Sequence, residues 1–278
     1  MTQSKLNLSN SGELELFFIG IGSAFAATMN QTNFLIIKGD THIMVDFGMT
    51  GPRALFQTAG LGILDIEVIF PTHSHADHIG GLECLALLNR YAGQKIFGQP
   101  KKTNVIITEE YQRVLWDATL RGGLEKNEES GGRNLNFGDY FNAIRPKWKT
   151  HQPREIFEIS IGSINLEIFR TKHIPDSAPS WETSFISYGL LVDGRVFISG
   201  DTRFDPELIE MYAPRAEIMF HDVQFFSEGV HAPLDKLKTL SAKIKEKMIL
   251  IHYADNWNQQ EINDFSGWAR QGKSYIFP

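Results

Sequence analysis

The stretch Thr72-His73-Ser74-His75-Ala76-Asp77-His78-Ile79-Gly80-Gly81 decides how the rest of this chain is interpreted. It holds three imidazoles and one carboxylate within six residues. The apolar run Ile66 to Phe70 before it predicts a buried strand, and the periodic segment Leu82 to Leu88 after it predicts a helix. Folds of the α/β type place their chemistry on such loops between a strand and a helix, so we expect a functional site here.

The spacing of these side chains indicates two adjacent metal ions. In an extended loop, side chains return to the same face at every second residue, so His73 and His75 can point the same way. Asp77 and His78 follow the turn into the helix and can face a second point nearby. Nitrogen and oxygen ligands without a thiolate fit Zn²⁺ in a hydrolytic site, with Mn²⁺ or Fe as alternatives.

At this motif the sequence resembles the metallo-β-lactamase-fold hydrolases, whose signature is His-x-His-x-Asp-His. The closest resemblance is to ribonuclease Z-like and cyclic-nucleotide phosphodiesterase-like members, and it covers essentially the whole chain. It implies one domain, residues 1–278, of mixed α/β class. The architecture that it implies is a four-layer αββα sandwich, with two mixed sheets and helices outside them.

The segment Gly20-Ile21-Gly22-Ser23-Ala24-Phe25 follows the predicted strand Leu14 to Ile19. A Gly-x-Gly after a strand also occurs in dinucleotide-binding loops, but the third glycine of that fingerprint is missing here. The segment resembles the Gly-x-Gly-Ser-Ala loop of ribonuclease Z-type proteins. We therefore expect a tight loop that passes close to the metal site.

Three further ligand candidates lie at or just beyond the ends of predicted strands: His173, Asp201 and His252. Asp201 lies on a glycine turn after the hairpin around Asp193-Gly194, where a carboxylate can approach two metals and bridge them. Together with the resemblance, this predicts two ligand sets that share Asp201. Site one would be His73, His75 and His173, and site two would be Asp77, His78 and His252.

Two residues near the motif have their own predictions. Asp46, at the end of the strand Ile43 to Asp46, either orients a ligand histidine or caps a turn or the next helix. Cys84 is expected to be a small core residue of the helix after the motif. Because it is the only cysteine, an internal disulfide is excluded, and a reducing compartment fits.

Composition narrows the classes further. The chain has 278 residues, 42% hydrophobic and 22% charged, as in ordinary globular proteins, and its net charge of −6 gives no argument for nucleic-acid binding. The polar segment Met1 to Gly12 lacks the apolar core of a signal peptide, and no apolar run has the length of a membrane span. We expect a soluble cytoplasmic protein without a membrane partner.

Beyond the motif helix, a helix is expected at Glu109 to Thr119 and a last helix near Glu261 to Arg270. Between residues 120 and 150 the glycine-flanked, charged stretch Gly122 to Gly132 predicts an exposed loop or lid. In ribonuclease Z a longer excursion forms an arm that grips transfer RNA. No basic Gly/Pro-rich arm of that kind is present, which argues against transfer RNA as the substrate.

A phosphodiesterase also needs a proton donor for the leaving oxygen. In ribonuclease Z-like enzymes a His-Glu-Ala-Thr motif and a downstream histidine form such a pair. This chain has His221-Asp222-Val223-Gln224 at the first position and His231 at the second, so Asp222 and His231 are the candidates. The alternative is that His231 caps the helix before Pro233. We predict that Asp77, like Asp222 and His231, is a catalytic residue.

Four aromatic residues are candidates for stacking a nucleobase, although core or loop packing explains them equally well: Trp181, Phe225, Phe226 and Trp257.

The sequence thus predicts a dinuclear metal-dependent hydrolase. Two divalent ions beside one carboxylate can share a water and lower its pKa toward neutrality, so a metal-bridged hydroxide is available for attack. The favoured substrate is a phosphodiester, in an RNA end or in a small or cyclic nucleotide. The alternatives are hydrolysis of a carbon ester, lactone, thioester or β-lactam by the same metals, and a non-catalytic metal-binding protein. The oligomeric state stays open, with a homodimer among the alternatives.

Overall fold

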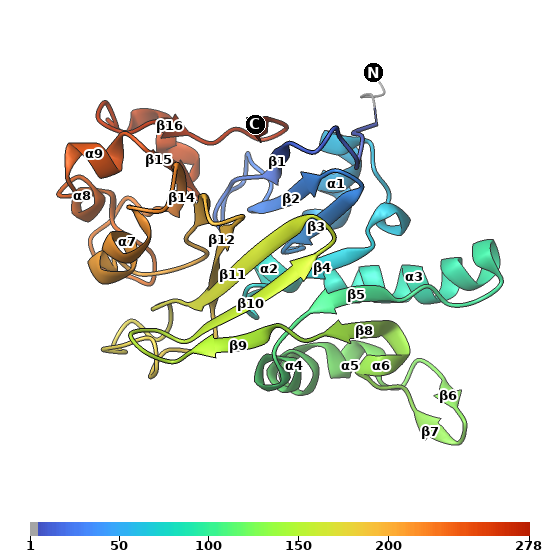
Figure 1. Cartoon of the computed structure of the whole chain (residues 1–278). Coiled ribbons are helices and arrows are strands. Elements are labelled where there is room, and N and C mark those ends of the chain that lie inside the picture. Colours follow the sequence, from blue (N-terminus) through green and yellow to red (C-terminus); the bar gives the residue numbers. More distant parts are fainter. Residues whose placement is uncertain (1–4) are drawn as a thin grey trace. The chain divides into compact units, whose positions relative to one another are not determined.

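The computed structural model describes residues 5–278 and separates into two compact units (Figure 1). Unit 1 holds residues 5–20, 33–146 and 274–278, and unit 2 holds residues 21–32 and 147–273. The first four residues of the polar N-terminal segment lie outside the described part of the chain. In that part, no helix has the length and apolar character needed to cross a membrane. The single-domain expectation stays a prediction.

Unit 1 is built on a seven-stranded mixed sheet with the order β17-β1-β2-β3-β4-β5-β8. The strands from β17 to β3 pair in antiparallel fashion, and those from β3 to β8 pair in parallel. The strand bounds are β1 Leu14–Gly20, β2 Asn33–Lys38, β3 Thr41–Val45, β4 Val68–Phe70, β5 Thr103–Ile106, β8 Phe141–Ile144 and β17 Ser274–Phe277. Because β3 and β4 are parallel neighbours, the residues that follow them meet at one edge of the sheet.

The first helix of unit 1 begins and ends at residues that favour such boundaries. The first helix has Pro52 in its first turn and Gly60 as a left-handed C-cap with φ of 63°. The helical bounds are α1 Gly51–Ala59, the 3-10 turn Ile63–Asp65, α2 Ala76–Ile79, α3 Leu82–Phe97, α4 Glu109–Leu115, the π-helical turn Trp116–Leu120, α5 Arg121–Leu124 and α6 Phe137–Tyr140.

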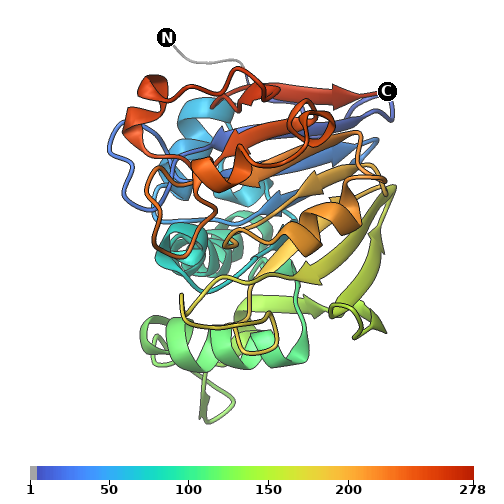
Figure 2. The same cartoon turned by 90° about the vertical axis from the view of Figure 1, so that its left-hand side faces the viewer.

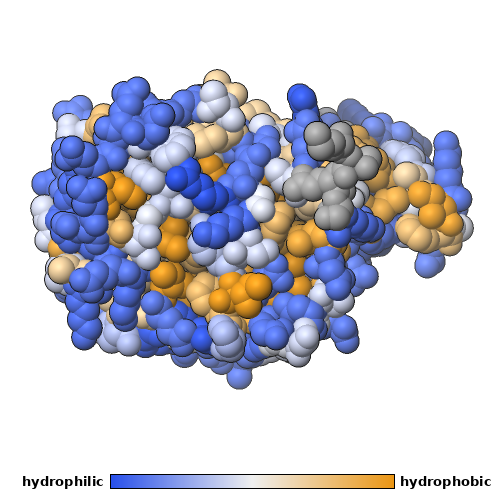
Figure 3. All heavy atoms as spheres, turned by 90° about the horizontal axis from the view of Figure 1, so that it is seen from above, coloured by the Kyte–Doolittle hydropathy of each residue, from blue (hydrophilic) through white to orange (hydrophobic). Residues whose placement is uncertain are grey.

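The prediction for Cys84 is wrong, because this side chain is exposed on α3. The buried face of α3 is formed by Leu82, Leu85, Ala86 and Asn89, and the helical period turns Cys84 away from it. The helix also runs beyond its predicted end to Phe97. The last turn of α3 exposes Ile96 and Phe97. The right-hand end of the molecule in Figure 3, where α3 ends, has hydrophobic surface (orange).

The stretch Gly122 to Gly132 has more regular structure than a loop. It contains the end of α5 and part of a small hairpin of β6 Glu129–Ser130 and β7 Arg133–Asn134. Most of its residues are exposed, as predicted. Its role as a lid stays a prediction.

Unit 2 is built on an eight-stranded mixed sheet with the order β16-β15-β14-β13-β12-β11-β10-β9. The strands from β9 to β13 are antiparallel neighbours, and those from β13 to β16 are parallel. The bounds are β9 Lys147–Thr150, β10 Ile156–Ile161, β11 Ile164–Arg170, β12 Tyr188–Val192, β13 Val196–Ile198, β14 Ile218–Asp222, β15 Met248–Ile251 and β16 Gly267–Trp268. Strands β11, β13, β14 and β15 run in one direction, so their C-terminal ends lie at the same edge.

Four short helical segments complete unit 2: α7 Pro206–Tyr212, α8 Leu234–Leu237, α9 Ala242–Lys245 and the 3-10 segment Asp255–Gln259. The Asp205 side chain caps α7 by accepting a hydrogen bond from the Leu208 N–H. Figure 2 shows α7 (orange) in front of the strands, where Tyr212 packs on Phe169 and Phe197 at ring-centroid distances of 4.5 and 5.5 Å.

The predicted helix near Glu261 to Arg270 is wrong. The chain forms turns there and then the short strand β16, whose Trp268 pairs with Leu250 of β15. Gly267, with φ of 139°, has a backbone conformation that does not belong to a helix.

Candidate active site

In unit 1, the loop between β4 and α2 arranges its ligand-type side chains in two pairs. His73 Nε2 lies 3.0 Å from His75 Nδ1. His78 Nε2 lies 3.3 Å from an Asp77 carboxylate oxygen. His75 is still extended, with φ of −76° and ψ of 148°, and α2 begins at the next residue. The change of backbone direction between His75 and Asp77 separates the pairs, as the spacing predicted.

Asp46 orients His78, so the first of its two predicted roles is confirmed. Its carboxylate lies 2.7 Å from His78 Nδ1 and accepts hydrogen bonds from the Thr72 N–H at 2.7 Å and the Thr72 hydroxyl at 2.9 Å. This contact places the proton of His78 on Nδ1 and leaves Nε2 for a metal. Burial raises the pKa of Asp46 above its ordinary value, against the opposing effect of His78 and Thr72.

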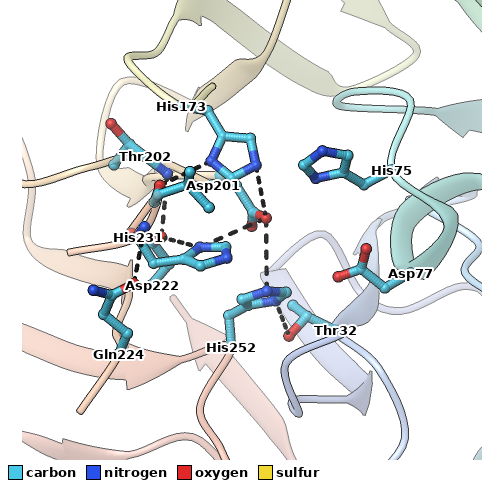
Figure 4. A network of polar contacts seen from close by, with 12 residues as sticks. Thr32, His75, Asp77, His173, Asp201, Thr202, Asp222, Gln224, His231 and His252 are labelled. Carbon is cyan, nitrogen blue, oxygen red and sulfur yellow. Dashed lines mark hydrogen bonds and ion pairs between the residues drawn. The ribbon is translucent and has the colours of Figure 1, made fainter. Parts of the chain in front are cut away.

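In unit 2, the imidazoles of His173 and His252 converge on Asp201 (Figure 4). Each has its Nε2 atom 3.6 Å from the same Asp201 carboxylate oxygen, and all three side chains are buried. His173 Nδ1 donates to the Val230 carbonyl oxygen at 2.9 Å, and His252 Nδ1 lies 3.3 Å from the Thr32 hydroxyl. These contacts at Nδ1 aim both Nε2 atoms at the carboxylate.

The turn that presents Asp201 requires glycine at position 200. Gly200 has φ of 60°, and a Cβ atom there would lie 2.2 Å from the Tyr188 carbonyl oxygen. Strand β12 therefore passes too close to residue 200 for any side chain there. Because the turn is held this tightly against β12, the Asp201 carboxylate is fixed next to the end of β13.

The ligand-type residues of each unit suit metal coordination. Donor atoms that share a tetrahedral ion lie on the order of 3–3.5 Å apart, since each is about 2.0–2.2 Å from it. The distances within the His73–His75 and Asp77–His78 pairs, and from His173 and His252 to Asp201, are 3.0 to 3.6 Å. They are typical of ligands around a shared cation.

Next to this cluster, buried Asp222 pairs with the partly exposed His231. His231 Nδ1 lies 3.0 Å from an Asp222 carboxylate oxygen and 3.8 Å from Asp201. Asp222 ends β14 and also accepts a hydrogen bond from the Thr202 N–H at 3.1 Å. Burial by itself would raise the pKa of Asp222, but hydrogen bonds from His221 and His231 outweigh it and lower that pKa. The carboxylate therefore stays ionised and orients the imidazole.

Two histidine assignments are now clearer. The residue before α8 is Pro233, and the helix has no side-chain cap, so the prediction that His231 caps it is wrong. His221 is fully buried, and its Nδ1 lies 3.2 Å from Asp222. Sequence reasoning gave His221 no role. The one feature of the sequence that could have indicated a role for His221 was its position directly before Asp222 in a strand.

Unit 2 also contains a cavity of about 620 Å³ beside His231 and His252, which is within the range of small-molecule sites, about 300–1,000 Å³. Its other walls come from three loop segments, residues 23–25, 223–230 and 254–256. Of the four aromatic stacking candidates, Phe225 and Phe226 line it. Trp181 is buried and donates to the Pro153 carbonyl, and Trp257 packs on Tyr253 and Trp268. Sequence reasoning did not single out Phe25, which also lines the cavity.

Solved structures with the same fold cover nearly all of the chain. The metallo-beta-lactamase fold protein YhfI from Bacillus subtilis matches with a TM-score of 0.66 at 14% identity, covering 95% of this chain and 99% of that one. The short form of human tRNase Z matches with a TM-score of 0.62 at 15% identity, covering 95% and 99%. The mixed α/β, metallo-β-lactamase fold that the sequence predicted is confirmed. This fold and the His/Asp clusters indicate a dinuclear metal site.

Sequence relatives give the family. A protein of Paenibacillus xerothermodurans is 34% identical over 273 residues, covering 95% of this chain and 98% of the relative. A protein of Bacillus phage 010DV004 is 31% identical over 270 residues, with the same coverage. Both are described as "Anti-Pycsar protein Apyc1", and the family model of that description matches residues 14–275. The chain is a metal-dependent hydrolase, and it belongs to the Anti-Pycsar protein Apyc1 family.

Proposed function

We propose that this chain is a phosphodiesterase that hydrolyses the phosphodiester of a small, cyclic nucleotide. The observation that carries the proposal is the Asp222–His231 pair, 3.0 Å apart and next to Asp201. A carbon ester with a good leaving group needs no proton donor, whereas a ribose oxygen leaves poorly without one. Membership in a family of phosphodiesterases of this fold supports the same reaction.

The motif and the family resemblance support an assignment of the metal ligands. We assign one ion to His73, His75 and His173 and the other to Asp77, His78 and His252, with Asp201 shared. Zinc is the first candidate because all donors are nitrogen or oxygen atoms in a hydrolytic setting. When bound, such ions supply an activated water and stabilise the charge that develops on the attacked phosphate.

The protein's own side chains would handle the proton and the orientation of the site. His231 donates its Nδ1 proton to Asp222, so its Nε2 atom is the one that delivers a proton to the leaving ribose oxygen. The Gln224 side-chain oxygen accepts a hydrogen bond from the His231 N–H at 3.2 Å and fixes its backbone. A small substrate is favoured over RNA because the net charge of −6 offers no general attraction for a polyanion. The single cysteine supports a cytoplasmic location.

The proposal is tested by comparing substrates after reconstitution with Zn²⁺ or Mn²⁺. A 3′,5′-cyclic nucleotide should be opened to the linear monophosphate, and p-nitrophenyl acetate should be a much poorer substrate. His231→Ala should slow the cyclic nucleotide by roughly 10²–10⁴-fold, the usual contribution of a positioned acid. It should slow bis(p-nitrophenyl) phosphate far less, because p-nitrophenolate leaves without a proton.

The control is His151→Ala, which changes an exposed histidine whose ring contacts Trp181. It should alter neither rate, and both variants should keep the metal content of the unchanged protein. If His231→Ala loses metal, or slows both diesters equally, His231 is not the proton donor. Faster hydrolysis of the carbon ester than of the nucleotide would contradict the phosphodiesterase assignment itself.

A further inference from the structure

We propose that the cavity beside His231 holds the base of the nucleotide, that Phe25 and Phe226 contact it, and that Asp255 positions Phe25. This inference rests on the proposed function and specifies how the substrate is held. It assigns a role to two aromatic side chains and one carboxylate outside the metal cluster. All three belong to unit 2 and line the cavity.

The cavity has the size and position that a nucleotide base requires. Its volume of about 620 Å³ is within the range of small-molecule sites, about 300–1,000 Å³. Two of its lining residues, His231 and His252, also belong to the reactive cluster. A substrate whose phosphate lies at that cluster would therefore have its base within reach of the aromatic walls.

Phe25 and Phe226 contribute little to the folded core. Phe25 is 96% exposed and Phe226 is 65% exposed. Full burial of such a side chain is worth about 1.5–3 kcal/mol, so these positions forgo most of that stabilisation. Phe225, in contrast, packs edge-on against Trp268 at a centroid distance of 5.8 Å. A stacked base would cover the exposed rings, and such stacking is worth about 1–3 kcal/mol per base.

The loop that carries Phe25 is fixed by hydrogen bonds on both sides. The Asp255 carboxylate accepts from the Ala27 N–H at 2.8 Å, the Thr28 N–H at 3.1 Å and the Thr28 hydroxyl at 2.5 Å. Before Phe25, the Ser23 N–H donates to the Tyr253 carbonyl oxygen at 3.1 Å. Tyr253 directly follows His252, and Asp255 comes three residues after it, so the loop is attached to the strand end that supplies a site residue.

The start of the same loop allows no side chain at Gly22. A Cβ atom there would lie 2.8 Å from the Ala26 Cβ and 3.1 Å from the Met29 Cβ. The loop is therefore folded tightly on itself, which is the tight turn that the Gly-x-Gly pattern predicted. Phe25 is exposed on a constrained backbone. The loop therefore loses little conformational entropy when a base binds to it.

The Phe226 loop is fixed by Gln224, a buried side chain. Its amide nitrogen donates to the Phe226 carbonyl oxygen at 2.9 Å and the Glu228 carbonyl oxygen at 2.8 Å. Both aromatic side chains thus extend from loops that polar side chains hold in place. This is the arrangement expected of a binding wall, where the contact surface is apolar and its support is hydrogen-bonded.

The test compares a cyclic nucleotide with a base-free analogue, methyl ribofuranoside 3′,5′-cyclic phosphate. Phe25→Ala and Phe226→Ala should each raise KM for the nucleotide by about 5–150-fold, which corresponds to the loss of base stacking. The KM for the analogue should stay within about twofold, and kcat for both substrates should change little. Phe56→Ala is the matched control, since Phe56 is about as exposed as Phe226, at 67%, but lies on α1 in unit 1.

Asp255→Asn tests the positioning role. An amide has one accepting oxygen where the carboxylate has two, so at least one donor of the loop loses its partner. The variant should raise KM for the nucleotide but not for the analogue. Combined with Phe25→Ala it should add almost nothing, because Asp255 acts through Phe25. Additive effects would overturn this part of the proposal.

Unchanged nucleotide KM values, or equal changes for both substrates, would overturn the base-binding role. Sedimentation velocity distinguishes another occupant: a Phe25→Ala change that alters the oligomeric state and leaves KM unchanged would assign the patch to a second copy of the chain.

If the unchanged protein hydrolyses neither substrate, the proposed function fails. Calorimetric binding of the cyclic nucleotide then decides the inference: weaker binding by Phe25→Ala supports it, and no binding by the unchanged protein overturns it.

Discussion

At the scale of single residues, the ligand-type side chains of the motif were recognisable, but the residues that orient them were not. His73, His75, Asp77 and His78 are recognisable because their spacing in one loop is chemically unusual. The role of Asp46 stayed open because it depends on β3 lying parallel to β4, with the Asp46 N–H donating to the Phe70 carbonyl. That contact joins residues that are distant in the sequence, and no local pattern shows it.

Phe25 was missed for a similar reason. In the sequence it is one apolar residue after a glycine-rich turn, which is typical of a side chain that packs inside. Its exposure results from hydrogen bonds between its loop and Asp255, which follows it by 230 residues. An exposed aromatic residue of this kind can be recognised only once the distant support is in place.

The support of His78 by Asp46 leads to a prediction about metal affinity. The Asp46 carboxylate accepts from the Thr72 N–H and hydroxyl, and it lies 2.7 Å from His78 Nδ1. In Asp46→Asn, one of these donors must face the NH₂ group, whichever way the amide is turned. Loss of such an orienting partner typically costs about 10–100-fold in metal affinity. Zinc competition with a chelating dye should show a loss of this size.

The matched control for this variant is Asp40→Asn, which changes an exposed aspartate in the turn between β2 and β3. Its zinc affinity should equal that of the unchanged protein. Equal affinity in Asp46→Asn as well would assign Asp46 a purely structural role in the turn after β3.

At the scale of elements, apolar strands with clear turns were predicted well. Strand β3 and the hairpin of β12 and β13 lie where the apolar run from Ile43 and the Asp193-Gly194 turn indicate. Edge strand β9 was not predicted, because it is short and exposed, including Trp148 at 58%. The missed helix α7 did carry a signal, since Asp205 and Pro206 are a typical cap and first helical residue.

The loop after β14 gives a prediction at this scale, because one side chain holds it. Gln224 donates to the Phe226 and Glu228 carbonyl oxygens and accepts from the His231 N–H. In Gln224→Glu, a carboxylate would face two carbonyl oxygens and could not donate to them. The lost bonds correspond to about 1–2 kcal/mol of local opening free energy. Hydrogen exchange of residues 225–230 should therefore become about 5–30-fold faster.

The control is Gln259→Glu, which changes an exposed glutamine at the end of the 3-10 segment. Exchange in residues 225–230 should be unaltered in that variant, and metal content should be unaltered in both. If Gln224→Glu exchanges at the original rate, other contacts of the loop hold it, and Gln224 has no special part in supporting Phe226.

At the scale of the whole molecule, the sequence indicated many of the strands but not their order in the sheets. The C-terminal strand β17 pairs with β1, so Ser274 lies opposite Phe17 and the chain ends join one sheet. No local pattern predicts this pairing, because it joins segments separated by most of the chain. The division of ligand residues between the units is likewise a property of topology: residues 73–78 belong to unit 1, and His173, Asp201 and His252 belong to unit 2.

Global stability should depend on pH through Glu167, which joins three elements of unit 2. This residue of β11 accepts hydrogen bonds from Lys149 of β9 at 2.7 Å and from Tyr212 and Arg215, at and after the end of α7, at 2.8 and 2.9 Å. Burial would raise the pKa of Glu167, but these partners outweigh it and lower the pKa from 4.5 to about 2. Because the folded state holds the carboxylate ionised, Glu167 stabilises the protein above pH 4.5. This contribution is lost as the pH falls toward 2.

The size of the effect must allow for solvent. Lys149 and Arg215 are each 44% exposed, so water and salt screen both ion pairs. Without screening, a pKa shift of this size would give roughly 3.4 kcal/mol. Because of the screening, we expect Glu167 to contribute about 1–2 kcal/mol to the free energy of unfolding. In urea unfolding at pH 7, Glu167→Gln should be less stable than the unchanged protein by this amount, and the difference should shrink as the pH falls to about 3. Glu158→Gln, on the neighbouring strand with only a 3.6 Å contact to Lys149, should show little difference at either pH. A Glu167→Gln deficit that is the same at both pH values would come from lost packing, and the ionised carboxylate would then not be its source.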